Sequence, residues 1–300
     1  MKSKLCFGMA IFICIMSAVI ITHRVEHKAS QPSGAQPVEA SWKKYKNIEE
    51  LVLAENEQAR KAGDSSQTAA DKMPDYTKMF PDLYTEYVMP KAVDKEKKIA
   101  YLTFDDGPSD NTYRVLDILQ EYDATATFFL IGSEIDRKHE GCLIRMANEG
   151  HTIGIHTYSH VCNEIYCSIE RYLDDFNLVY DRIYDVTGKR VNIYRFPWGS
   201  NNRYSKNIKD ALIEEMERRG FTCYDWTVDS KDSNGKPSAY TILRNIKKDI
   251  KRQNQPIILL HDSGANGLMV RLLPDIIKML RQMGYEFDTL DHREPYQFPW

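Results

Sequence analysis

The pattern of apolar and polar positions changes near residue 81, and from there onward it is typical of an α/β protein. Apolar runs of strand length alternate with longer segments in which apolar residues recur at helical spacing. The short runs predict strands at residues 98–104, 125–131, 151–156, 191–195, 222–228, 256–260 and 285–289. The longer segments predict helices at residues 111–122, 142–148, 169–187, 206–219, 240–252 and 270–283.

This alternation of strands and helices predicts a parallel sheet covered by helices. The strand–helix units fit an irregular (β/α)7–8 barrel closed around a core. Barrels of this kind carry their chemistry at the carboxyl ends of the strands. We therefore expect unusual polar residues to gather where the predicted strands end.

Residues 1–80 have a different texture. Lys2 and Lys4 precede an uncharged, mostly apolar run over residues 5–22, which is at the short end of what spans a bilayer as a helix. No A-x-A-like exit site follows, so residues 1–22 are interpreted as an uncleaved membrane anchor rather than a cleaved signal peptide. Residues 23–80 have the composition of a polar stalk. The domain at residues 81–300 is then expected outside the cell membrane.

Composition and charge narrow the choice of partners. The formal net charge of −3 and a pI of about 6.3 imply no broad basic face, which argues against nucleic acid as a partner. Outside the apolar run, Cys142, Cys162, Cys167 and Cys223 lack the spacing of a structural zinc site. Cys162 and Cys167 are close enough to form a disulfide, and apolar packing explains them equally well.

Two adjacent carboxylates, Asp105 and Asp106, end the first predicted strand in "YLTFDDGPSD". Taken alone, this segment is typical of a turn that leads into a helix. Adjacent residues of an ideal strand point to opposite faces, but where a strand ends the backbone turns and both side chains can reach the same mouth.

Two histidines, His156 and His160, follow the third predicted strand in "TIGIHTYSH". Histidines four residues apart, within one helical turn, can present two imidazoles to one metal ion. Two imidazoles and one of the carboxylates would give three protein ligands and leave a position open for water, as in hydrolytic metal sites. The other carboxylate would be free to act on that water.

Further polar residues end the later strands. A guanidinium at Arg195, in "YRFPWGS", can keep the non-ligating carboxylate ionised as a base. Pro197 indicates a fixed loop in which Trp198 forms a stacking wall. In "PIILLHDSG", His261 closes an apolar strand, and Asp229 of the neighbouring strand can hold it as an imidazolium that acts as a general acid. Singly these residues also suit a surface ion pair or a core histidine; together they converge on one predicted surface.

The segments "TFDDG", "HTYSH", "RFPWG", "DWTVDS" and "LLHDS", in this order, resemble the polysaccharide deacetylases, the NodB-homology group or carbohydrate esterase family four. The resemblance covers about residues 95–292. It implies that Asp105 is the catalytic base, that Arg195 orients this base, and that the metal ligands are Asp106, His156 and His160.

The same resemblance implies roles for the later motifs. His261 would be the catalytic acid and Asp229 the aspartate that tunes it. Trp198 would offer its backbone N–H to the oxyanion, and Leu259 would form an apolar wall near the acetyl methyl group. Members often carry a tryptophan where this chain has Ser233, and Trp226 could supply part of that wall.

These residues lead to the hypothesis of a metal-dependent hydrolase that releases acetate from an acetylated polysaccharide. The expected substrate is N-acetylglucosamine of peptidoglycan, because an anchor and a stalk place the site within reach of the wall. Chitin-like oligomers, poly-N-acetylglucosamine and O-acetyl xylan remain alternatives with the same chemistry. The His₂Asp set suits one divalent ion, Zn²⁺ first, with Co²⁺ or Ni²⁺ able to substitute.

Two hypotheses of other classes remain. A catalytically silent surface protein that binds glycan or metal would typically have lost one of the motif residues, and here all are present. A different barrel metallohydrolase, such as a phosphoesterase, usually carries more ligands and often two metals.

Overall fold

The computed structural model describes residues 76–87 and 94–299. The predicted anchor at residues 1–22 and nearly all of the predicted stalk lie outside these ranges. Within them, no helix combines the length and the apolar character that crossing a bilayer requires. The described residues belong to one compact unit.

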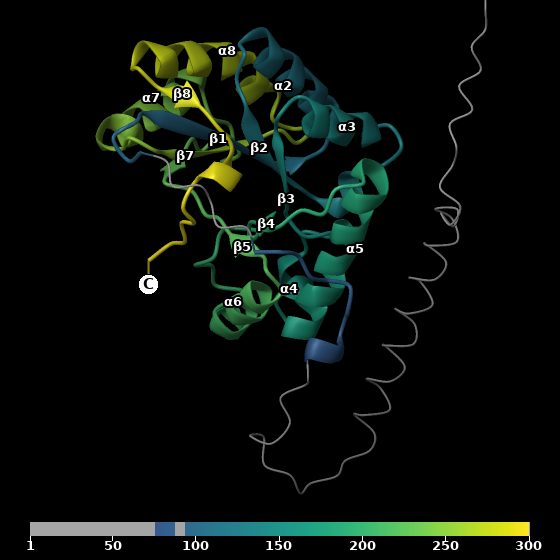
Figure 1. The fold of residues 1–300 in the computed structure, drawn as a ribbon. Helices are drawn as coiled ribbons and strands as arrows, with labels where there is room; N and C mark the ends of the chain where they lie inside the picture. Colours follow the sequence, from purple (N-terminus) through teal and green to yellow (C-terminus); the bar gives the residue numbers. More distant parts are fainter. Residues whose placement is uncertain (1–75, 88–93, 300) are drawn as a thin grey trace, which may run out of the picture. The chain divides into compact units, whose positions relative to one another are not determined.

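The unit is built on an eight-stranded sheet whose strand pairs are parallel (Figure 1). The strands are β1 (Ile99–Gly107), β2 (Ala126–Leu130), β3 (Thr152–Ile155), β4 (Ile193–Tyr194), β5 (Thr222–Cys223), β6 (Val228–Asp229), β7 (Ile257–His261) and β8 (Glu286–Phe287). Their order is β5-β4-β3-β2-β1-β7-β6, and β8 pairs with the beginning of β1. The predicted strand–helix alternation with parallel pairing is confirmed.

The prediction of a closed barrel is wrong. The single strand expected at 222–228 is two short strands, β5 and β6, which form the two edges of the sheet among the residues described. Between them, the backbone N–H of Asp225 donates to the carbonyl of Tyr296 at 2.7 Å. The C-terminal segment therefore takes the place of a closing strand pair, and the sheet is a curled, open half-barrel.

Helices pack around the outer side of this sheet (Figure 1). They are α2 (Asp110–Glu121), α3 (Glu140–Asn148), α4 (Cys162–Ile165), α5 (Ile169–Thr187), α6 (Lys209–Arg218), α7 (Ala239–Asp249) and α8 (Gly267–Gln282), with short 3₁₀ turns at Tyr76–Lys78, Gly132–Glu134, Ile250–Arg252 and Leu290–His292. Ser109, Ser168 and Ser238 cap α2, α5 and α7 by accepting from backbone N–H groups of the first turn. The sequence did not predict α4.

Alternation along β1 separates two apolar clusters. Leu102 and Phe104 belong to the large core between sheet and helices, whereas Tyr101 belongs to a smaller cluster inside the curl. Thr103 and Asp105 have the same parity as Tyr101, so they point inside as well. The period of this central strand thus delivers a carboxylate into the interior of the half-barrel.

A buried arginine fastens the first described segment to the domain. The Arg219 guanidinium donates to Glu215 Oε1 at 2.7 Å and to the carbonyls of Tyr76, Met79, Phe80 and Leu83 at 2.7–3.1 Å. A carbonyl that is buried without a donor costs free energy, so one side chain stabilises a segment that has few backbone hydrogen bonds of its own.

Replacing this arginine should destabilise the domain. We expect Arg219→Ala to lower the free energy of unfolding by about 2–4 kcal/mol, because the carbonyls of Met79 and Leu83 lose their donor at about 1–3 kcal/mol each. Glu215 keeps Arg218 as a partner. Arg218→Ala, at the neighbouring and partly exposed arginine, should cost about 1 kcal/mol or less. Urea unfolding of the full-length chain measures both, and equal losses would contradict the assignment.

Candidate active site

The two adjacent carboxylates share one site because of a bulge at the end of β1. Asp105 lies opposite Phe129 of β2 and Gly107 lies opposite Leu130, so Asp106 is an extra residue in the register. The backbone of Asp106 is left-handed, with φ of 71°. The bulge cancels the alternation of the strand, so the side chains of Asp105 and Asp106 both face the carboxyl-terminal end of the half-barrel.

Gly107 cannot carry a side chain where β1 ends. A Cβ there would lie 2.6 Å from Oδ1 of the buried Asp262. The Asp262 carboxyl accepts from Thr112 Oγ1 at 2.5 Å, and its backbone carbonyl accepts from Ser109 Oγ at 2.6 Å. The end of β1 is thereby packed closely against the end of β7.

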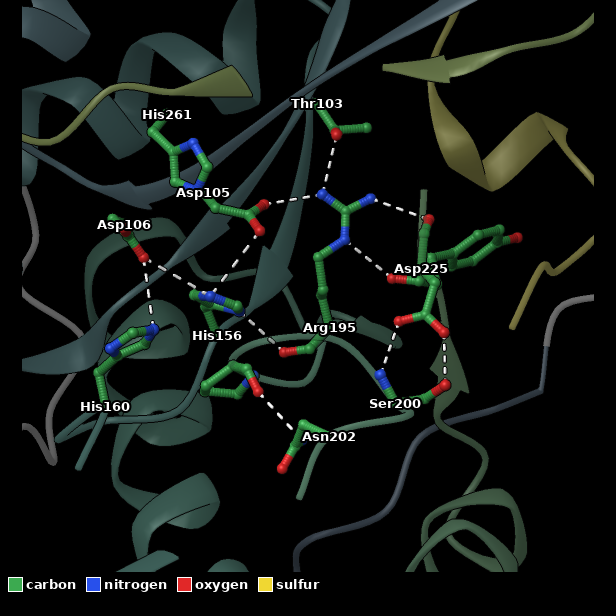
Figure 2. A network of polar contacts seen from close by, with 12 residues as sticks. Thr103, Asp105, Asp106, His156, His160, Arg195, Ser200, Asn202, Asp225 and His261 are labelled. Carbon is green, nitrogen blue, oxygen red and sulfur yellow. Dashed lines mark hydrogen bonds and ion pairs between the residues drawn. The ribbon is translucent and has the colours of Figure 1, made fainter. Parts of the chain in front are cut away.

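His156 and His160 lie in a loop after β3 and not in a helical turn, so the predicted helical presentation is wrong. Thr157 and His160 have left-handed backbones, with φ of 68° and 56°, and these fold the loop back. Nε2 of His156 is 3.6 Å and Nε2 of His160 is 3.4 Å from Oδ1 of Asp106 (Figure 2). Ligand atoms of these three residues all lie within 4.8 Å of one another.

The donor set fits a divalent cation. Nδ1 of His156 is 2.8 Å from the carbonyl of Arg195, and because a carbonyl only accepts, Nδ1 carries the proton and Nε2 keeps its lone pair. Burial and the neighbouring His156 lower the pKa of His160 to about 3, so its imidazole is neutral at neutral pH. Burial also raises the pKa of Asp106, which a cation would counteract.

Asp105 is held by a fully buried guanidinium. Nη1 of Arg195 donates to Asp105 Oδ1 and to Thr103 Oγ1, both at 2.8 Å (Figure 2). Nε and Nη2 of Arg195 donate to the carbonyls of Tyr224 at 2.9 Å and Asp225 at 3.1 Å. This arrangement fixes the position and orientation of the Asp105 carboxylate.

His261, at the end of β7, lies on the other side of the two carboxylates from His156 and His160 (Figure 2). Its Nδ1 is 2.7 Å from Oδ1 of Asp232, and its backbone N–H donates to Oδ2 of Asp232 at 2.8 Å. Burial alone would lower the pKa of His261, but the hydrogen bond and charge of Asp232, with Asp105 and Asp106, raise it to about 9. An imidazolium is therefore the stable form at neutral pH.

The predicted pairing of His261 with Asp229 is wrong. The Asp229 carboxylate instead accepts from the backbone N–H of Lys231 at 2.8 Å. Strand β6 ends at Asp229, and the chain then turns through a left-handed Lys231, which carries Asp232 to the end of β7. Asp232 lies two residues beyond the quoted segment "DWTVDS", and only the turn reveals that its carboxylate, rather than that of Asp229, reaches His261.

The residues predicted to line the substrate site are Trp198, Pro197, Trp226 and Leu259, and they differ in exposure and in contacts. Trp198 is 55% exposed and stacks on His160, with ring centroids 4.7 Å apart. The carbonyl of Pro197 accepts from Tyr166 Oη at 3.0 Å, which fixes the Trp198 loop. Trp226 packs edge-on against Phe298 at 4.8 Å, and Leu259 is buried in β7.

Asp225 is a buried residue beside Arg195 for which the sequence predicted no role. Its carboxylate accepts from the backbone N–H and the hydroxyl of Ser200 at 2.8 and 2.5 Å, and from the backbone N–H of Phe298 at 2.7 Å. The Phe298 ring in turn lies against Gly199, where a Cβ would be 2.6 Å from it. The C-terminal segment is thus packed onto the loop that carries Trp198.

Comparison with known proteins agrees with this geometry. The family model for polysaccharide deacetylase matches residues 92–216. The peptidoglycan-N-acetylglucosamine deacetylase of Bacillus cereus is 35% identical over 68% of this chain and 73% of its own length. The peptidoglycan-N-acetylmuramic acid deacetylase PdaA of Bacillus subtilis is 32% identical over 73% of this chain and 80% of its own length.

A solved structure gives the same result. The catalytic domain of peptidoglycan N-acetylglucosamine deacetylase from Eubacterium rectale superposes with a TM-score of 0.65 at 33% identity, covering 70% of this chain and 97% of that one. The resemblance predicted from the five motifs is confirmed in fold and in sequence. The chain belongs to the polysaccharide deacetylases, the NodB-homology group of carbohydrate esterase family four.

Proposed function

We propose that this protein removes N-acetyl groups from a polysaccharide, with N-acetylglucosamine of peptidoglycan as the first candidate, and that it uses one divalent cation. The observation that carries the proposal is the placement of Asp106, His156 and His160 beside two pre-formed pairs. One pair is Asp105 with Arg195, and the other is His261 with Asp232.

The first pair supplies the base. Asp105, oriented by Arg195, accepts a proton from the water that attacks the acetamide carbon. A divalent cation held by Asp106, His156 and His160 would polarise the acetamide carbonyl and lower the pKa of water. The backbone N–H of Trp198 donates to the oxyanion that develops on the former carbonyl oxygen.

The second pair supplies the acid. His261, protonated and held at Nδ1 by Asp232, donates the proton on Nε2 to the nitrogen of the leaving amine. The carbon–nitrogen bond then breaks, and acetate and a free amino sugar are released.

Zn²⁺ is the proposed ion, because two imidazoles and one carboxylate are ligands that suit it. Co²⁺ and Ni²⁺ could replace it at the same donors.

Support for a peptidoglycan substrate comes from relatives, since the similar Bacillus proteins are named for acetylated sugars of peptidoglycan. An anchor at residues 1–22 and a stalk to residue 80 would place the domain outside the cell, near the wall. Trp198 and Trp226 are proposed to contact the glycan. A substrate panel that includes chitin oligomers, poly-N-acetylglucosamine and acetylated xylan distinguishes the alternatives.

Acetate release tests the role of the base. The full-length chain should release acetate from purified peptidoglycan, and Asp105→Asn should lower kcat by about 10²–10⁴-fold because general base catalysis is lost. Asp117→Asn, at an exposed carboxylate of α2, should leave the rate unchanged. Full activity in Asp105→Asn would refute the mechanism. Glycan binding without any acetate release would favour a silent binding protein.

Metal removal tests the cation. Treatment with a chelator should abolish acetate release, and Zn²⁺ should restore it at one ion per chain. Metal analysis that finds more than one ion per chain would favour a two-metal hydrolase, and activity that survives chelation would exclude the proposed chemistry.

The pH profile tests the acid. Since the acid must be protonated, kcat/KM should fall as the pH rises through the pKa of His261, which is about 9. Asp232→Asn removes the charge that raises this pKa, so the alkaline limb should move to lower pH by about 1–3 units. Asp229→Asn serves as the matched control and should leave the limb in place. The opposite pattern would restore Asp229 as the partner of His261.

A further inference from the structure

The loop that carries His160 rests on one carboxylate of helix α5. Asp175 accepts from two consecutive backbone amides, with Oδ1 at 2.5 Å from Tyr158 N and Oδ2 at 3.0 Å from Ser159 N. Both oxygens of a partly buried side chain are thus used on the short stretch between the two histidines. Asp175 lies outside the sequence motifs, and the sequence alone predicted no role for it.

This stretch has an unfavourable backbone that needs such support. Thr157 and His160, on either side of the two amides, adopt left-handed conformations that side chains other than glycine avoid. The carbonyls of Thr157 and Tyr158 accept from the backbone N–H groups of Gly132 and Ser133, both at 3.0 Å. The loop is therefore held by its carbonyls from one side and by its amides from Asp175.

The two histidines are fixed in different ways. His156 is tied through its backbone to Leu130 at 2.9 Å and through its ring to the carbonyl of Arg195 at 2.8 Å. The ring of His160 stacks on Trp198, and its direction depends on where the preceding loop places its Cα. Any shift of the amides held by Asp175 changes the 3.4 Å separation of His160 Nε2 from Asp106 Oδ1.

We infer that Asp175 is a positioning residue of the cation site, which sets the loop at residues 157–160 so that His160 presents Nε2 toward Asp106 and His156. The inference rests on the proposed function, because it takes the cation site as given. Groups that orient metal ligands without touching the metal commonly change metal affinity by about 10–100-fold.

The test is the affinity of the full-length chain for Zn²⁺, measured without substrate by competition with a chromophoric chelator. In Asp175→Asn the side-chain shape is kept, but one acceptor becomes an amide NH₂ and one backbone N–H loses its partner. We expect Zn²⁺ to bind about 10–100-fold more weakly, with an unchanged circular dichroism spectrum. Asp174→Asn, the neighbouring residue on α5, is the matched control and should bind Zn²⁺ as the original chain does.

Outcomes separate the two proposals. A folded Asp175→Asn variant with unaltered Zn²⁺ affinity overturns the positioning role and leaves the proposed function intact. An original chain that binds no Zn²⁺ overturns the proposed function itself. If Asp175→Asn does not fold, amide hydrogen exchange of the metal-free original chain decides: the Tyr158 and Ser159 amides should be protected, and exchange at the rate of free loop amides overturns the inference.

Discussion

The buried contact between Arg195 and Asp105 is the interaction on which the rest of the site depends. A guanidinium and a carboxylate without solvent would be costly unless all their polar atoms had partners. Here Thr103, Tyr224 and Asp225 accept from three further N–H groups of the arginine, and the arginine carbonyl fixes the tautomer of His156. One side chain thereby aligns β1 and the segment after β5 inside the curl.

The charges of the site are balanced around this contact. Asp105 has Arg195 as its counter-charge, and Asp232 has the His261 imidazolium. Asp106 lies between two imidazoles, one of which, His160, is neutral at neutral pH. A dication at this point would supply the positive charge that a half-buried carboxylate lacks, so the proposed cation site and the proposed acid–base pairs would form one electrostatic unit.

The sequence was informative where periodicity or a motif governs the structure. Alternating apolar runs located the strands, and α5 was predicted with its observed bounds, because its apolar face and the glycine after it leave little choice. The motif residues other than Asp229 were brought together as expected, since the ends of parallel strands meet at one edge. These features follow from local pattern and from sheet topology, both of which can be read along the chain.

What the sequence did not reveal depends on single backbone conformations and on distant partners. The bulge at Asp106, the turn at Lys231 that brings Asp232 to His261, and the loop of His160 each require a left-handed non-glycine residue, which is uncommon and has no pattern along the chain. At the open edge of the sheet, the backbone N–H of Asp225 donates to the carbonyl of Tyr296, which lies more than seventy residues further along the chain. Such contacts have no periodic signal.

Left-handed backbones at Asp106, Thr157, His160 and Trp198 also have an evolutionary consequence. A glycine would adopt each of these conformations without strain, so the surrounding structure bears an energetic burden in order to keep side chains there. Selection for thermal stability alone would favour replacement of these residues by glycine. If related proteins keep non-glycine residues at these positions, selection for the activity of the site has continued. Their replacement by glycine would be an early sign that a duplicated protein is no longer under that selection.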